Sequence, residues 1–112
     1  MKTLTVDIAK QFSAEPAGRY VDDGPHSGQV FRDKWLIPAL KDSERVQIVL
    51  DGAEGYGSSF LEEAFGGLVR GGFSEADLTQ RLILVSEEDP TLIDEIRAYI
   101  AQEDERRRSR GR

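Results

Sequence analysis

Apolar and polar side chains alternate at the start of the chain. Positions 4, 6 and 8 are apolar and positions 3, 5 and 7 are polar, which predicts a strand with one buried face. The mostly apolar runs at residues 46–50 and 82–85 predict two interior strands. A weaker fourth strand is expected near residues 19–21.

Between these runs, apolar residues recur at helical spacing. Ser27 is expected to cap a helix that reaches about residue 40, with Pro38 bending it or ending it early. A second helix begins at residues 58–59, and its buried stripe consists of Phe60, Leu61, Ala64, Phe65, Leu68 and Val69. A close approach of this helix to the sheet would explain Gly66 and Gly67 inside it.

Two further helices are expected in the second half of the chain. Ser74 is placed to start a short one, and Asp89 and Pro90 open a last one. The order predicts an α/β fold with a mixed sheet of about four strands, covered mainly on one face by three to four helices.

The charge divides the chain into an acidic body and a basic end. Residues 1–103 hold 10 Lys and Arg against 19 Asp and Glu, and residues 104–112 hold five Arg against two acids. We expect one domain over residues 1–103 and a disordered Arg-rich tail over 104–112. No specific nucleic-acid partner is expected, because the acidic body repels phosphates.

Several function classes are disfavoured by residue types that are missing. The chain has no cysteine and a single histidine, His26, so thiol chemistry and a metal centre of histidines and cysteines are not expected. No window is long and apolar enough for a membrane helix. These features predict a cytoplasmic protein that is not an enzyme and has no cofactor.

The turn after residues 46–50 carries the most suggestive chemistry. It is expected to bind an anion or a partner through Gly55, Tyr56, Gly57, Ser58, Ser59 and Phe60. A helix start is electropositive, since its first amides lack partners. The turn is not a dinucleotide fingerprint, because Phe60 stands where the third glycine belongs, and a nucleoside-triphosphate loop would need a lysine, none of which follows Lys41.

The two serines of this turn have different expected roles. Ser59 and Glu62 have the spacing of a capping box, in which each side chain satisfies a backbone N–H group. Ser58 is not needed for that cap and is the more available hydroxyl. Both are candidates for regulatory phosphorylation.

Two segments of the chain resemble a known family. Residues 27–32 read Ser-Gly-Gln-Val-Phe-Arg, and residues 57–68 read Gly-Ser-Ser-Phe-Leu-Glu-Glu-Ala-Phe-Gly-Gly-Leu. Both are similar to segments of a STAS-like domain family of unknown function, related to the STAS domains of bacterial anti-sigma-factor antagonists. The match departs from the STAS turn at two positions, where Gly57 replaces an aspartate and Phe60 replaces a glycine.

The wider STAS resemblance implies a signalling role. In those domains a serine at the helix start is phosphorylated by a histidine-kinase-like ATPase, and Ser58 matches that serine by position. The function expected from the resemblance is a regulatory protein-interaction module. The alternative is a domain that binds a small anion or a nucleotide at residues 57–59.

Overall fold

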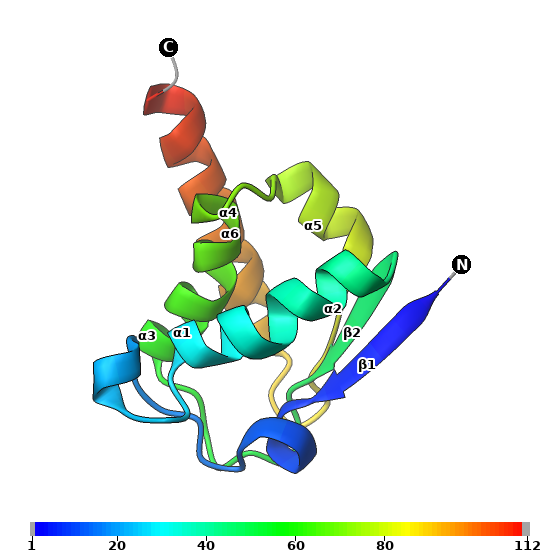
Figure 1. Cartoon of the computed structure of the whole chain (residues 1–112), viewed down its shortest axis with the longest axis vertical. Coiled ribbons are helices and arrows are strands. Elements are labelled where there is room, and N and C mark those ends of the chain that lie inside the picture. Colours follow the sequence, from blue (N-terminus) through cyan, green and yellow to red (C-terminus); the bar gives the residue numbers. More distant parts are fainter. Residues whose placement is uncertain (1, 111–112) are drawn as a thin grey trace.

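The computed structural model of the chain describes residues 2–110. Three strands alternate with helices along the chain (Figure 1). The strands are β1 (Thr3–Asp7), β2 (Arg45–Val49) and β3 (Leu82–Val85). The helices are α1 (Gly28–Phe31), α2 (Ile37–Asp42), α3 (Ser58–Leu61), α4 (Gly67–Arg70), α5 (Glu75–Arg81) and α6 (Thr91–Arg110), with π-helical stretches at Ile8–Phe12, Arg32–Leu36 and Glu62–Gly66 and a 3₁₀ turn at Val21–Asp23.

The sheet is entirely parallel, with the strand order β1-β2-β3. Val6 lies beside Ile48, and Ile48 lies beside Leu84. The expected sheet of four strands in mixed directions is therefore wrong for the described residues. The three strongest strand patterns did locate the three strands that form.

The weak fourth strand near residues 19–21 is a turn instead. The carboxylate of Asp23 accepts hydrogen bonds from the backbone N–H groups of Arg19 and Tyr20, at 3.0 and 2.9 Å. These amides are satisfied locally and so are not available to a neighbouring strand. The chain then coils into the 3₁₀ turn Val21–Asp23.

One face of the sheet forms the core and the other is open. The side chains of Val6, Val46 and Ile48 are at most 5% exposed, whereas Thr5 and Ile83, on the opposite face, are exposed. Crossovers between parallel strands are right-handed, so a strand order that runs in one direction places both crossovers on the same side. This agrees with the expected helical cover on one face.

The first crossover is one continuous helix, the α1–α2 helix (residues 28–42). Ser27 caps it as expected, because its Oγ accepts a hydrogen bond from the N–H of Val30 at 3.3 Å. Pro38 does not end it, since the helix continues to Asp42. The π-helical stretch Arg32–Leu36 ends two residues before Pro38, and this wider turn accommodates a residue that has no N–H group.

The second crossover begins with another continuous helix, the α3–α4 helix (residues 58–70). Its predicted stripe is confirmed as core, because all six side chains are at most 1% exposed. The ring of Phe60 lies 6.0 Å from that of Phe31 and 5.9 Å from that of Tyr56. This aromatic cluster holds the start of the helix against the α1–α2 helix.

The two glycines inside the α3–α4 helix lie against charged side chains rather than against the sheet. A Cβ added to Gly67 would collide with the guanidinium group of Arg32, and one added to Gly66 would lie 2.6 Å from the carboxylate of Glu62. The expected close approach of helix and sheet is therefore wrong. The missing side chains make room for charged groups.

The Arg-rich end is helical over its described part. Helix α6 continues through Arg110 and rises beyond the other elements in Figure 1. Arg107 donates to the backbone oxygen of Val69, and Arg108 pairs with Asp104 at 2.9 Å. Residues 104–110 are thus not the irregular tail that the charge run predicts, because their guanidinium groups find acceptors on neighbouring turns. Residues 111–112 lie outside the described part.

Candidate functional site

The loops that follow the strands gather at the lower edge of the molecule in Figure 1. Asp51, just after β2, accepts hydrogen bonds from the backbone N–H groups of Glu87 and Glu88, at 3.0 and 2.8 Å. Glu88 in turn accepts from the N–H of Gly52 at 2.8 Å. Gly52 has a φ of 93°, which favours glycine. These reciprocal bonds fix the loop that leads to the candidate turn.

Tyr56 anchors the turn to the end of β2. Its hydroxyl donates to the backbone oxygen of Leu50 at 2.7 Å, and its ring is partly buried beside Phe60. Burial raises the pKa of Tyr56, and the carboxylates of Asp7 and Asp51 raise it further. Tyr56 is therefore a neutral anchor and is not available for acid or base chemistry near neutral pH.

The start of the α3–α4 helix is uncovered. Gly57 is its N-cap residue, with extended backbone angles and no capping side chain. Ser58 and Ser59 follow inside the first turn, and both are exposed. The expected capping box is wrong, because the helix starts before Ser59 and the Glu62 carboxylate bonds to arginines instead. Both hydroxyls are consequently free of a capping role.

The other predicted site residues differ in exposure. Gly55 is exposed, and a Cβ added there would meet nothing within 4 Å. The side chain of Phe60 is fully buried and belongs to the core. The exposed part of the predicted surface is therefore formed by Gly55, Gly57, Ser58 and Ser59.

Ser58 has neighbours on helix α6. The hydroxyl of Tyr99 donates to the carboxylate of Glu95 at 2.6 Å, and this bond is the main reason that the pKa of Tyr99 is raised. The nearby Ser58 hydroxyl has a smaller effect on the pKa of Tyr99, in the opposite direction. Ser58 thus lies near Tyr99 of helix α6, whose hydroxyl is already bonded to a carboxylate.

A small cavity of about 250 Å³ lies beside the turn, beyond the carboxyl ends of β2 and β3. Its acidic lining residues are Asp51, Glu54, Glu88 and Asp89. Among residues 2–110, no three histidines, cysteines or acids are arranged to hold a metal ion. Because the lining is negative, it disfavours a free anion, and anion binding at residues 57–59 stays a prediction.

A network of ion pairs begins at Glu62, one turn after Ser58 on the α3–α4 helix. Arg70 contacts Glu62 at 2.8 Å, Glu63 at 3.3 Å and Glu103 at 2.7 Å. Arg19 contacts the first two of these glutamates at 2.5 and 3.3 Å. Hydrogen bonds to Glu62 and Glu103 raise the pKa of Arg70, and hydrogen bonds from Arg70 and Arg19 lower the pKa of Glu62. The network ties a loop and two helices together.

The pattern of residue types did not predict this network, although the sequence contains one signal of it. Glu103 follows Ile96 and Ile100 at helical spacing, and all three are at most 3% exposed. Glu63 likewise lies within the apolar helix and is 6% exposed. A carboxylate on the buried face of a helix requires a charged partner, because an isolated buried charge is very unfavourable.

The two segments that carry the family resemblance pack against each other. Gly28 lies directly against the backbone of Phe60, and an added Cβ would collide with the Phe60 carbonyl oxygen. Arg32 reaches across Gly67 and donates to the carboxylate and the backbone oxygen of Glu63, at 2.5 and 3.0 Å. The residues of these two segments thus form the packing contact between the α1–α2 helix and the α3–α4 helix.

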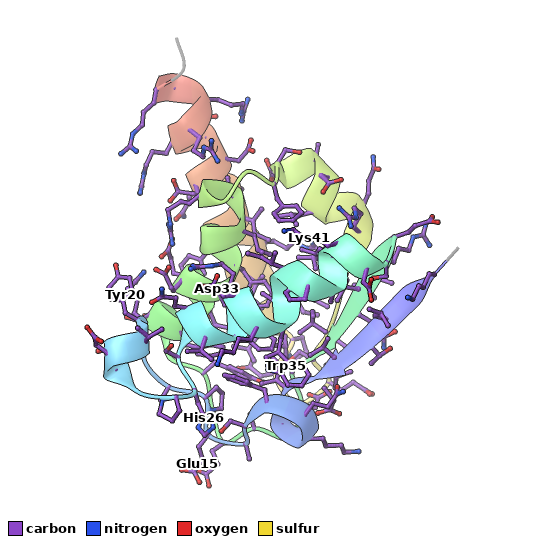
Figure 2. All side chains as sticks on the ribbon, viewed as in Figure 1. Glu15, Tyr20, His26, Asp33, Trp35 and Lys41 are labelled. Carbon is purple, nitrogen blue, oxygen red and sulfur yellow. The ribbon has the colours of Figure 1, made fainter. Side chains whose placement is uncertain are left out.

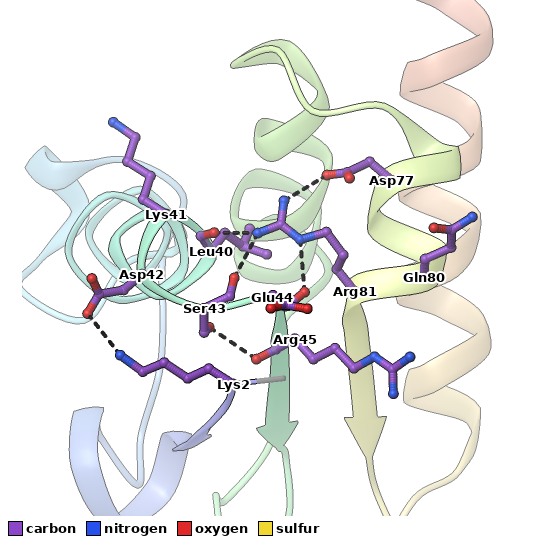
Figure 3. A pocket seen from close by; sticks show the side chains of 10 residues that line it. All are labelled: Lys2, Leu40, Lys41, Asp42, Ser43, Glu44, Arg45, Asp77, Gln80 and Arg81. Atoms are coloured by element: carbon purple, nitrogen blue, oxygen red, sulfur yellow. Dashed lines mark hydrogen bonds and ion pairs between the residues drawn. The ribbon is translucent and has the colours of Figure 1, made fainter.

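An open hollow of about 670 Å³ lies at the opposite end of the sheet (Figure 3). Arg81 dominates it and donates to the backbone oxygens of Leu40, Ser43 and Glu44 while pairing with Asp77 at 3.0 Å. These carbonyls end the α1–α2 helix or follow it directly. The guanidinium group is therefore engaged in capping that helix, and the hollow has no free cation from Arg81.

The fold and the uncovered helix start together define a small α/β domain that offers serine hydroxyls beyond its parallel strands. Residues 27–92 match a family described as a STAS-like domain of unknown function (DUF4325). The chain belongs to this family. No curated protein and no solved structure matches the chain. Within residues 2–110, none of the helices has the length and apolar character needed to span a membrane.

Proposed function

We propose that this domain is a non-enzymatic regulatory module that binds a protein partner and is switched by phosphorylation of Ser58. The observation that carries the proposal is the exposed Ser58 hydroxyl in the first turn of the α3–α4 helix, with no capping role. The wider STAS resemblance supports the same position. A cytoplasmic signalling role follows from this proposal.

A phosphoryl group at this position has a defined electrostatic effect. It adds about −1.5 to −2 charge next to the unpaired N–H groups of the first helical turn, which can hydrogen-bond its oxygens. It also adds negative charge near Tyr99, whose hydroxyl donates to the carboxylate of Glu95. Repulsion between the phosphate and the Glu95 carboxylate would change the surface that the α3–α4 helix and helix α6 present to a partner.

The phosphoryl donor in this proposal is ATP bound to a histidine-kinase-like ATPase. The Ser58 oxygen attacks the γ-phosphorus, the bond to ADP breaks, and the hydroxyl proton passes to a base. His26 packs its ring beside Phe12, 5.4 Å between centroids, and no hydrogen bond among the described residues joins it to Ser58. The partner supplies both the nucleotide and the base.

Phosphopeptide mass spectrometry of the protein from its native cells tests the modification. Trypsin releases residues 46–70 as one peptide that contains both serines of the turn, and fragment ions distinguish Ser58 from Ser59. We expect phosphate on Ser58. Phosphate on neither serine, under conditions in which the partner is active, would contradict the proposal.

Binding to the purified ATPase partner tests the consequence. We expect Ser58→Asp to change the affinity, measured by calorimetry, while Ser58→Ala behaves as the unphosphorylated protein. Ser59→Asp is the matched control, because it places the same charge one residue later on an equally exposed position. Equal affinities of wild type and Ser58→Asp would overturn the switch.

A further inference from the structure

A second surface lies between the loop at Arg19, the α3–α4 helix and helix α6. It is a cleft of about 550 Å³, which we call the arginine cleft. Its lining includes Arg19, Tyr20, Arg70, Tyr99, Gln102 and Arg106. Figure 2 shows Tyr20 projecting from the loop at this edge of the molecule.

The three arginines of the cleft form one cluster. Arg19 and Arg70 share Glu62 and Glu63 as ion-pair partners. Arg70 and Arg106 share Glu103, at 2.7 and 3.3 Å. Because the arginines are held by common carboxylates, their guanidinium groups lie side by side although they come from three separate parts of the chain.

In this cluster the arginine side chains are more exposed to solvent than the glutamate side chains with which they pair. The side chains of Arg19, Arg70 and Arg106 are 31, 36 and 58% exposed. The glutamate partners are 23, 8 and 3% exposed, in the order Glu62, Glu63, Glu103. An approaching partner therefore meets positive charge first, although the numbers of arginines and glutamates are equal.

Two of the arginines retain donors for a partner. To acceptors among residues 2–110, the side chain of Arg19 donates only through Nη1, and that of Arg106 likewise only through Nη1. A guanidinium group carries five N–H donors, so most of those of Arg19 and Arg106 are unused. Carboxylates and phosphates are the acceptors that match this geometry, and an acidic segment of a protein supplies the carboxylates.

Aromatic side chains complete the surface. Tyr20 is 53% exposed, and the guanidinium carbon of Arg19 lies 6.0 Å from the centre of its ring. Tyr99 lies on the same cleft. Tyrosine and arginine are the residues that most often dominate binding energy at protein interfaces.

We propose that the arginine cleft binds an acidic segment of a partner protein. A nucleic acid fits the charge distribution less well, because the chain as a whole carries a net charge of −6 and only a small area is positive. A short acidic segment places its carboxylates over the three arginines without bringing a long polyanion against the acidic remainder.

The cleft also connects to the regulatory serine, and this step rests on the proposed function. Glu62 lies one helical turn after Ser58, on the same side of the α3–α4 helix, and it lines the cleft together with Tyr99. Phosphorylated Ser58 therefore adds negative charge at the rim. The added charge weakens the attraction of the cleft for an acidic segment, so phosphorylation releases the partner.

Titration of the ¹⁵N-labelled protein with a hexaglutamate peptide tests the cleft without any modified serine. We expect the amide signals of Arg19, Tyr20 and Arg106 to shift, and the affinity to fall as salt is raised. Arg106→Glu should weaken binding about five-fold or more. Shifts confined to other parts of the molecule would overturn the proposal.

The matched control is Arg108→Glu. Arg108 is 57% exposed on the same helix and pairs with acids of its own helix, but it does not line the cleft. It should change the affinity by less than about two-fold. Equal effects of the two reversals would refute a specific site, as would tighter binding of hexathymidylate than of hexaglutamate to the same residues.

Comparison of wild type with Ser58→Asp then tests the link to the serine. Weaker hexaglutamate binding by Ser58→Asp supports the release of the partner by phosphorylation. Unchanged binding, with the Arg106→Glu effect intact, would refute the link to the serine while the cleft stands. Loss of the Arg106→Glu effect would refute the cleft while the phosphorylation of Ser58 remains a separate question for mass spectrometry.

Discussion

Gly28 packs directly against the backbone carbonyl of Phe60, with no room between them for a methyl group. This contact joins the two segments by which the chain is recognised as a STAS-like domain. Phe31 and Phe60 stack beside it, and Arg32 spans from one segment to the other. Helix packing therefore accounts for much of the two segments. The regulatory role proposed for Ser58 concerns a residue beside this packing contact.

Gly28→Ala should destabilise the fold. The added methyl group collides with backbone rather than with a flexible side chain, so we expect a loss of about 1–3 kcal/mol in the free energy of unfolding. Urea denaturation measures it. Gly55→Ala is the control, because a methyl group there meets nothing within 4 Å, and it should change stability by less than about 1 kcal/mol, in the stabilising direction.

Glu63→Ala should have a larger effect than loss of a surface carboxylate. The side chain of Glu63 is 8% exposed and pairs with Arg32, which is 13% exposed. Its removal leaves a buried guanidinium group with one partner fewer, at a cost of about 3 kcal/mol. Glu105→Ala removes a carboxylate that is 63% exposed and should cost less than about 1 kcal/mol. Similar melting temperatures for the two variants would contradict a stabilising network.

Acid should weaken the network through Glu62. Hydrogen bonds from Arg70 first, and from Arg19, hold the pKa of Glu62 below its ordinary value of 4.5. A carboxylate with a lower pKa in the folded chain stabilises the fold above its unfolded pKa, and this stabilisation is lost as the pH falls through the folded pKa.

The melting temperature should therefore fall as the pH drops below about 4.5. Glu62→Gln should make this fall shallower, because an amide does not titrate. Glu15→Gln alters an exposed carboxylate without an ion-pair partner among residues 2–110 and should leave the slope of wild type. An unchanged slope in Glu62→Gln would show that Glu62 is not coupled to folding.

The two serine positions at helix starts should respond differently to alanine. Ser27 is fully buried and its Oγ accepts from the N–H of Val30, so Ser27→Ala should cost about 1–2 kcal/mol. Ser59 is exposed and has no capping role, because the N-cap residue is Gly57. Ser59→Ala should cost less than about 0.5 kcal/mol by thermal denaturation. A cost of about 1 kcal/mol or more would restore the capping box.

The sequence determined the local elements. Side-chain alternation and apolar runs located β1, β2 and β3, and helical spacing located the buried stripe of the α3–α4 helix, because these patterns depend only on the period of one element. The glycine-rich turn also placed a helix start at residues 58–59, and the helix begins at Ser58. The same segment also indicated exposed hydroxyls there, since two small polar residues follow a glycine-rich turn.

Only the tertiary structure decided which side chains meet. Residues 19–21 do not form the fourth strand because the backbone of Arg19 is bonded to the side chain of Asp23. The carboxylate of Glu62 does not cap the helix start because it forms ion pairs with Arg19 and Arg70. The basic end became a helix because Arg107 and Arg108 reach acceptors on other turns. Long charged side chains pair with groups that lie within reach in the folded protein. A periodic pattern along the chain does not show which groups those are.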